Sequence, residues 1–157
     1  MGKKSSQKGR IGSKKAVKIL VVDDVQLCRM ILERKLRSAG HEVLLAESGE
    51  EALQLIDIDP PDVILLDLMM PGMDGEETLR RIQRTGGRPM VIVVSAAIDR
   101  DRLLRLKELG VCGFIAKPIN FQRLEEEIEK ALESRRRLEK EIAELVGRSN
   151  GSTGEGE

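Results

Sequence analysis

The stretch Pro61-Asp62-Val63-Ile64-Leu65-Leu66-Asp67-Leu68-Met69-Met70-Pro71-Gly72-Met73-Asp74-Gly75 decides the fold. Its apolar run at residues 63–66 predicts a strand that is buried on both faces, and the strand ends in the lone carboxylate of Asp67. Pro71, Gly72 and Gly75 then break the chain into a loop. Open α/β sheets bind ligands at the C-terminal tips of their strands, so Asp67 is predicted to lie at a binding site.

A second apolar strand, at residues 17–22, ends in the same way, in Asp23 and Asp24. Two strands would therefore present three carboxylates, those of Asp23, Asp24 and Asp67, at one edge of the sheet. Like charges held close together repel one another and need a cation to compensate them. The pattern predicts a cation site at this edge.

Strand and helix patterns alternate along the rest of the chain. Further strands are predicted at residues 43–46, 90–94 and 111–116, and helices at residues 27–36, after Ser48, at 76–84, at 101–109 and from 120 onward. Five strands that alternate with five helices predict an α/β fold with a parallel sheet and helices on both of its faces.

Four of the predicted strands end in polar side chains: Asp23 and Asp24, Asp67, Ser95, and Lys117. Carboxylates suit Mg²⁺, which keeps several waters. A lysine and a hydroxyl at the same edge point further, to a phosphoryl group whose oxygens they would contact. One carboxylate must then accept the group as an aspartyl phosphate. Asp67 is the best candidate because it stands alone on the central strand.

Four segments together resemble the receiver domain of two-component response regulators, in its single-domain, chemotaxis-Y-like form. They are Val21-Val22-Asp23-Asp24, residues 66–75, Val94-Ser95-Ala96 and Phe114-Ile115-Ala116-Lys117-Pro118. The resemblance covers roughly residues 17–133. It implies a doubly wound, flavodoxin-like sheet of order 2-1-3-4-5, an order for which this family is a standard example. It also implies that the donor is the phosphohistidine of a histidine kinase or of a histidine phosphotransfer protein.

The same resemblance assigns Asp67 as the phosphoacceptor and implies a Mg²⁺ ion beside it. The direct ligands would be Asp24, Asp67 and the backbone carbonyl of Met69, with Asp23 acting mainly through water. Such a protein is a phosphoacceptor that assists its own phosphoryl transfer and dephosphorylation, and is not otherwise an enzyme. Its signal is altered binding of a protein output target.

Three further roles follow from the resemblance. Ser95 would be the switch hydroxyl, Lys117 the contact to the phosphoryl group and Phe114 the switch aromatic. Phe114 is equally well explained as a core residue. The Lys117–Pro118 peptide bond would be cis.

Two positions depart from the polar pattern of the family. Met69 lies two residues after Asp67, and Ala97 lies two residues after Ser95. In the family these positions flank the path of the hydrolytic water. Neither side chain can orient a water molecule, so help with dephosphorylation is missing.

The last predicted helix, residues 120–146, is too long for the domain. Its apolar side chains follow an alternating three-four spacing that only Arg135 interrupts: Phe121, Leu124, Ile128, Ala131, Leu138, Ile142 and Leu145. Such a helix would be roughly 40 Å long, against ~17–20 Å for the strands. Residues 135–146 are predicted to project and to pair with another helix, most simply as a homodimer. A frayed tail is the alternative, because about two heptads alone are marginal.

The remaining composition fits one receiver domain at residues 16–134. The chain has 157 residues and no formal net charge. Residues 1–15 are predicted to be a disordered basic arm and residues 147–157 a disordered tail. We expect no membrane span and no nucleic-acid-binding or catalytic output domain in this chain. Cys28 and Cys112 are predicted to be reduced, buried thiols of a cytoplasmic protein.

Two other functions fit this pattern less well. A phosphorylation-independent scaffold or adaptor could use the receiver fold for interaction alone, but it would not need all of Asp23, Asp24, Asp67, Ser95 and Lys117. A flavodoxin-like FMN carrier would need a Ser-, Thr- or Gly-rich phosphate loop after the first strand, where Asp23 and Asp24 would repel phosphate.

Overall fold

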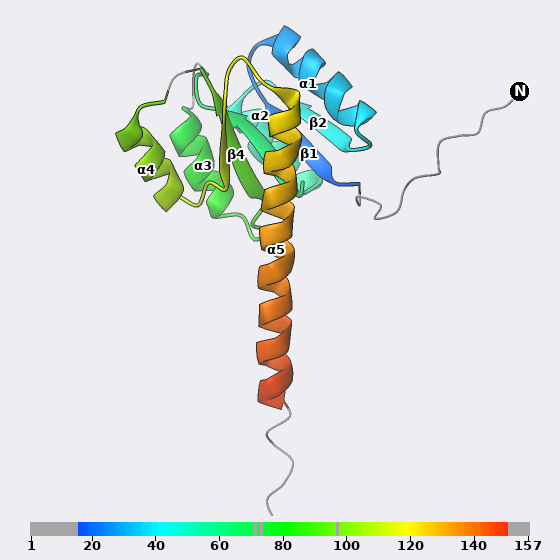
Figure 1. The fold of residues 1–157 in the computed structure, drawn as a ribbon. Helices are drawn as coiled ribbons and strands as arrows, with labels where there is room; N and C mark the ends of the chain where they lie inside the picture. Colours follow the sequence, from blue (N-terminus) through cyan, green and yellow to red (C-terminus); the bar gives the residue numbers. More distant parts are fainter. Residues whose placement is uncertain (1–15, 71, 73, 97, 151–157) are drawn as a thin grey trace, which may run out of the picture.

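Strands and helices alternate without interruption along the chain (Figure 1). The computed structural model describes residues 16–70, 72, 74–96 and 98–150. Its elements are β1 (Lys18–Val22), α1 (Gln26–Ser38), β2 (Glu42–Ala46), α2 (Gly49–Ile58), β3 (Val63–Asp67), α3 (Gly75–Gln83), β4 (Met90–Ser95), α4 (Arg100–Glu108), β5 (Gly113–Ala116) and α5 (Phe121–Asn150).

The five strands form one parallel sheet in the order β2-β1-β3-β4-β5, which confirms the predicted topology. Val22 of β1 is in register with Leu66 of β3, and Asp67 with Val94 of β4. The residues that end these strands are therefore neighbours at one edge of the sheet. The register sets Asp23, Asp67 and Ser95 side by side.

The central strand β3 is buried over its whole length, as the apolar run predicted. Its alternate residues enter two separate apolar layers. Ile64 and Leu66 pack with residues of α2, α3 and α4, whereas Val63 and Leu65 pack with residues of α1 and α5. Helices thus cover both faces of the sheet, so β3 is shielded from water and its terminal carboxylate alone reaches the site.

Four of the described helices begin at side-chain caps, namely Ser48, Asp74, Asp99 and Asn120. Ser48 accepts a hydrogen bond from the backbone N–H of Glu51 at the start of α2. Asp74 and Asp99 do the same for α3 and α4. An oxygen at this position satisfies one of the free N–H groups of the first turn. Asp74 and Asp99 thus stabilise the first turns of the helices that follow β3 and β4.

Helix α5 runs to Asn150, four residues past the predicted end at Val146. The prediction of a disordered tail is wrong for residues 147–150, while the basic arm at 1–15 and residues 151–157 lie outside the described part of the chain. Figure 1 shows the second half of α5 extending well beyond the rest of the domain. Despite the length of α5, none of the described helices combines the length and apolarity needed to cross a membrane.

Both cysteines are free thiols, but they are less buried than predicted. Cys28 is half-buried and Cys112 is exposed, because Cys112 precedes β5 at the margin of the sheet. The Cys112 thiol lies 3.8 Å from the sulfur of Met90. This partial burial of the sulfur raises its pKa, which keeps it protonated at neutral pH.

Gly75 allows α3 to approach the segment that follows β3. A Cβ atom at Gly75 would lie 2.6 Å from the backbone Cα of Leu68. We predict that Gly75→Ala lowers the free energy of unfolding by about 1–3 kcal/mol, because backbone must move to admit the methyl group. Urea unfolding measures this change. Gly86→Ala is the matched control, with nothing within 4 Å of the added atom. Equal stability of the two variants would contradict the close packing.

Candidate functional site

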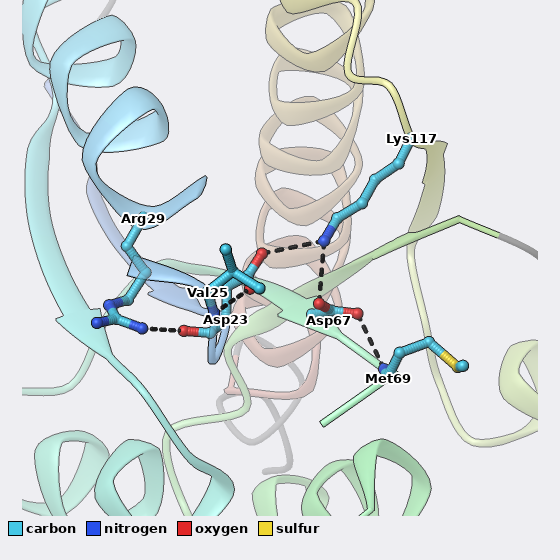
Figure 2. Close-up of polar contacts among 6 residues, drawn as sticks. All are labelled: Asp23, Val25, Arg29, Asp67, Met69 and Lys117. Carbon is cyan, nitrogen blue, oxygen red and sulfur yellow. Dashed lines mark hydrogen bonds and ion pairs between the residues drawn. The ribbon is translucent and has the colours of Figure 1, made fainter. Parts of the chain in front are cut away.

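Polar side chains from four strands meet at the C-terminal edge of the sheet. Asp23 follows β1, Asp67 ends β3, Ser95 ends β4 and Lys117 follows β5. Figure 2 shows the side chains of Asp23, Asp67 and Lys117 directed toward one another. The predicted convergence of these residues is therefore present, and it arises because all of the strands run in the same direction.

The three carboxylates form a group suited to a cation. One oxygen each from Asp23, Asp24 and Asp67 lies within 4.8 Å of the others. Asp23 and Asp67 are only 2% and 4% exposed, whereas Asp24 is exposed to solvent. A hard divalent cation such as Mg²⁺ takes oxygen ligands and keeps waters, so a group that is open on one side fits it.

Lys117 compensates the two buried carboxylates. Its Nζ donates hydrogen bonds to Oδ2 of Asp67 at 3.0 Å and to Oδ2 of Asp23 at 3.1 Å (Figure 2). Burial lowers the pKa of Lys117, but the bonds to Asp67 and Asp23 outweigh it and raise that pKa above its ordinary value of 10.5. The contribution of the ionised Lys117 to the stability of the folded state is therefore present at neutral pH and is lost as the pH rises through the raised pKa. At neutral pH Lys117 is a cation.

Backbone groups hold the same carboxylates from the other side. Oδ1 of Asp67 accepts a hydrogen bond from the N–H of Met69, and Oδ1 of Asp23 accepts one from the N–H of Val25, both at 2.9 Å. Arg29 of α1 donates to the backbone carbonyl of Asp23 at 2.6 Å. The two N–H bonds fix the orientation of the carboxylates, and the Arg29 contact holds the backbone of Asp23 (Figure 2). Sequence reasoning missed Arg29, because no motif marks a side chain that returns to the preceding loop.

Ser95 brings a hydroxyl with no protein partner to the site. The residue is 1% exposed, and within the described residues its buried Oγ makes no hydrogen bond. A buried hydroxyl without a partner costs about 1–3 kcal/mol. In register terms it lies beside the tip of β3, since Val94 pairs with Asp67. An oxygen of a bound ligand would satisfy it.

The remaining predicted residues lie around this centre. Phe114 is half-buried against the apolar layer of α2, α3 and α4, and its switch role stays a prediction. The Lys117–Pro118 peptide bond is cis, as the resemblance implied. The side chain of Met69 is 60% exposed and leads away from the Asp67 carboxylate in Figure 2. Ala97 lies outside the described residues.

The charges of the site favour binding of a cation, and then of an anionic group beside that cation. Three carboxylates and one ammonium carry two net negative charges, which a divalent cation would neutralise. With the cation bound, an incoming phosphoryl group would meet the cation, the ammonium of Lys117 and the hydroxyl of Ser95. These are the groups that stabilise a transferring phosphoryl group.

Known proteins resemble this chain over the same region. The sequence profile described as the response regulator receiver domain matches residues 19–129. A probable transcriptional regulator, ycf27 of Guillardia theta, is 37% identical over 73% of this chain and 45% of its own length. Sporulation initiation phosphotransferase F of Bacillus subtilis is 34% identical over 73% of this chain and 93% of its own length.

Solved structures agree with the sequence matches. The chemotaxis protein CheY4 of Vibrio cholerae superposes with a TM-score of 0.71 at 27% identity, over 74% of this chain and 98% of its own. The chain spans about half the length of several of the curated relatives it matches, which are named as transcriptional regulators. The profile match covers well over half of the chain and coincides with the parallel sheet and its polar edge, so this chain belongs to the response regulator receiver domain family.

Proposed function

We propose that this protein is a signal-transduction receiver that accepts a phosphoryl group on Asp67 from the phosphohistidine of a histidine kinase or histidine phosphotransfer protein. The observation that carries the proposal is the ammonium of Lys117 between the buried carboxylates of Asp67 and Asp23, beside the unpartnered hydroxyl of Ser95. An ordinary structural ion pair explains the first contact. It does not explain a third carboxylate and a buried free hydroxyl at the same edge.

The proposed reaction is a transfer between two nucleophiles. An oxygen of Asp67 attacks phosphorus, a P–O bond forms, and the P–N bond to the donor imidazole breaks as that imidazole leaves. The ammonium of Lys117 would then bind an oxygen of the transferred phosphoryl group, and Ser95 would donate its O–H to another of these oxygens. The protein thus supplies the acceptor and the electrostatic groups, and acts on no separate substrate.

Mg²⁺ would be held directly by Asp24, Asp67 and the backbone carbonyl of Met69. Asp23 would contact it indirectly, through a water ligand. When bound it would neutralise the carboxylates and the oxygens of the incoming group. The exposure of Asp24 supports this assignment, because it leaves one side of the carboxylate group open to a hydrated ion.

The face of α1 next to the site is proposed to receive the donor. Leu27, Met30 and Ile31 are large apolar side chains that are exposed on this helix. Helix α1 begins three residues after Asp23, so a donor protein bound there would hold its phosphohistidine close to the edge that carries Asp67. Exposed apolar side chains on a helix that begins close to the site support a protein partner.

The output is proposed to be altered protein binding by the receiver itself, with the projecting part of α5, predicted at residues 135–146, as an association surface. A cytoplasmic location is part of the proposal, and the two free cysteines are in keeping with it. The rival scaffold function would leave Asp67 unmodified, and the labelling experiment below separates the two.

Asp67→Asn should abolish phosphorylation. Acetyl phosphate with Mg²⁺ is expected to add one base-labile phosphate to the unmodified chain, and intact-mass spectrometry with peptide mapping should place it on Asp67. Asp74→Asn is the matched control, because Asp74 is a nearby acid in the following loop and Asn also caps a helix. Equal labelling of the Asp67→Asn variant would refute the acceptor assignment, and no labelling of the unmodified chain would favour the scaffold.

Asp24→Ala should weaken Mg²⁺ binding by well over tenfold, which is more than ~1.4 kcal/mol, since a direct ligand is lost. Isothermal titration, or the rise in Tm with Mg²⁺, measures the affinity. Asp57→Ala is the control, because Asp57 is an exposed acid near the C-terminal end of α2, at the opposite edge of the sheet. If both variants bind Mg²⁺ as the unmodified chain does, Asp24 is not a ligand.

The phosphorylated form should be long-lived for a receiver. Met69 and Ala97 offer no group that positions a water, so replacing them together (Met69→Asn with Ala97→Glu) is expected to speed loss of phosphate about tenfold or more. The decay is followed by mass spectrometry after removal of the phosphodonor. Ile58→Asn, an exposed apolar residue at the end of α2, should leave the rate unchanged. An unchanged rate in the double variant would mean that water access is controlled elsewhere.

A further inference from the structure

Helix α5 leaves its domain at Arg135. Leu124, Ile128 and Ala131 are buried against the sheet, and the guanidinium of Arg135 forms an ion pair with Asp62 at 3.8 Å. Beyond this ion pair four large apolar side chains are more than half exposed: Leu138 (56%), Ile142 (51%), Leu145 (63%) and Val146 (54%). Arg135 is thus engaged with its own domain, which removes it from the predicted helix-pairing seam.

The exposed apolar side chains continue the face that packs on the domain. At about 100° per residue, all four lie within about 60° of the direction of Leu124, and Ile142 lies on that direction itself. The projecting half of α5 therefore carries the core-facing stripe beyond the edge of the domain. A helix that covers this stripe must lie below the domain in the view of Figure 1, at the end of the sheet opposite to the start of α5.

This placement excludes a parallel pair of identical chains. A parallel partner would extend its own residues 121–134 upward along the same face, into the space that the sheet of the first copy fills. In an antiparallel partner, residues 121–134 extend in the opposite direction, away from the first domain. The domain of that partner therefore lies at the other end of the pair. Only the antiparallel arrangement lets two copies cover each other's stripe.

The charged side chains next to the exposed apolar stripe of α5 favour one antiparallel register. When Ile142 of one copy faces Leu145 of the other, Glu141 lies beside Arg148 of the opposite copy, twice in the pair by symmetry. A shift of one heptad in one direction sets Glu141 against Glu141, and a shift in the other sets Arg148 against Arg148. Both shifts bring like charges together.

The same register also fits the length of the helix. It places residue 150 of one copy level with residue 137 of the other, about half a turn below Arg135, so the described end of α5 stops just short of the opposite domain. We infer that residues 138–150 of two copies of this chain pair as antiparallel helices, with Ile142 opposite Leu145 and Glu141 beside Arg148. This association goes beyond the proposed phosphoryl transfer and does not depend on it.

Charge exchange tests the register in the full chain. Sedimentation velocity should show a dimer at tens of micromolar. Glu141→Arg or Arg148→Glu alone should weaken it about tenfold, because each replaces two attractions by two repulsions, and the two changes combined should restore it. Lys140→Glu, on the opposite side of the helix, is the control and should leave the dimer intact. Circular dichroism checks that α5 remains helical in each variant.

Spin-label distances test the orientation. Labels are placed at Glu144→Cys, near the centre of the proposed pair, or at Glu133→Cys, with Cys28 and Cys112 replaced by Ser. In the antiparallel dimer the labels at 133 should be ~30 Å farther apart along the axis than those at 144, whereas a parallel pair would give similar distances at both sites.

Three results would overturn the inference. They are a monomer at every concentration up to about 100 µM, similar label distances at the two positions, and a double charge exchange that fails to restore association. A monomer would assign the stripe to a different protein. Phosphorylation of Asp67 is measured separately, so failure of either proposal leaves the other standing.

Discussion

The ammonium of Lys117 between the buried carboxylates of Asp67 and Asp23 is the contact on which the site depends. It joins the ends of β1, β3 and β5, and so spans the sheet from one side of the central strand to the other. Without this cation two carboxylates, each nearly excluded from water, would face one another, at a cost that burial magnifies. The other groups at this edge surround the ion pairs. The N–H groups of Met69 and Val25 bind the Oδ1 atoms of Asp67 and Asp23, while Asp24 and Ser95 could contact a bound ligand.

The α/β class and the parallel sheet could be predicted because a buried parallel sheet has a strong sequence pattern, whereas the strand order came from the resemblance to receiver domains. Residues 63–66 are apolar without alternation, which only a strand covered on both faces requires. The end of α5 was harder to predict. The Gly-rich composition after Val146 suggested a tail, but a single glycine inside a helix costs only about 1 kcal/mol, and α5 continues through Gly147 to Asn150. Cys112 was misjudged because apolar neighbours in sequence do not determine which way a residue at the sheet margin faces.

Most of the site could be predicted for a related reason. Residues that end parallel strands must share one edge, so Asp23, Asp67, Ser95 and Lys117 could be grouped from their order alone. No comparable rule predicts the contacts of side chains on helices and loops. Arg29 on the carbonyl of Asp23 and Arg135 beside Asp62 both depend on where a long side chain comes to lie. His41 is similar: it follows a turn, yet its ring is nearly buried and its Nε2 lies 3.1 Å from Glu125 at the start of α5.

Helix α5 also relates two distant places in the molecule by simple mechanics. It begins four residues after Lys117, at the edge that carries the site, and its 30 residues extend ~45 Å toward and past the opposite edge. Its first half is held against the sheet by the buried side chains of Leu124, Ile128 and Ala131. The part that projects from the domain starts at Arg135. A tilt of about 5° in this free part, which is ~23 Å long, would move its far end by ~2 Å. Small adjustments beside Lys117 are thus magnified where the helix is free.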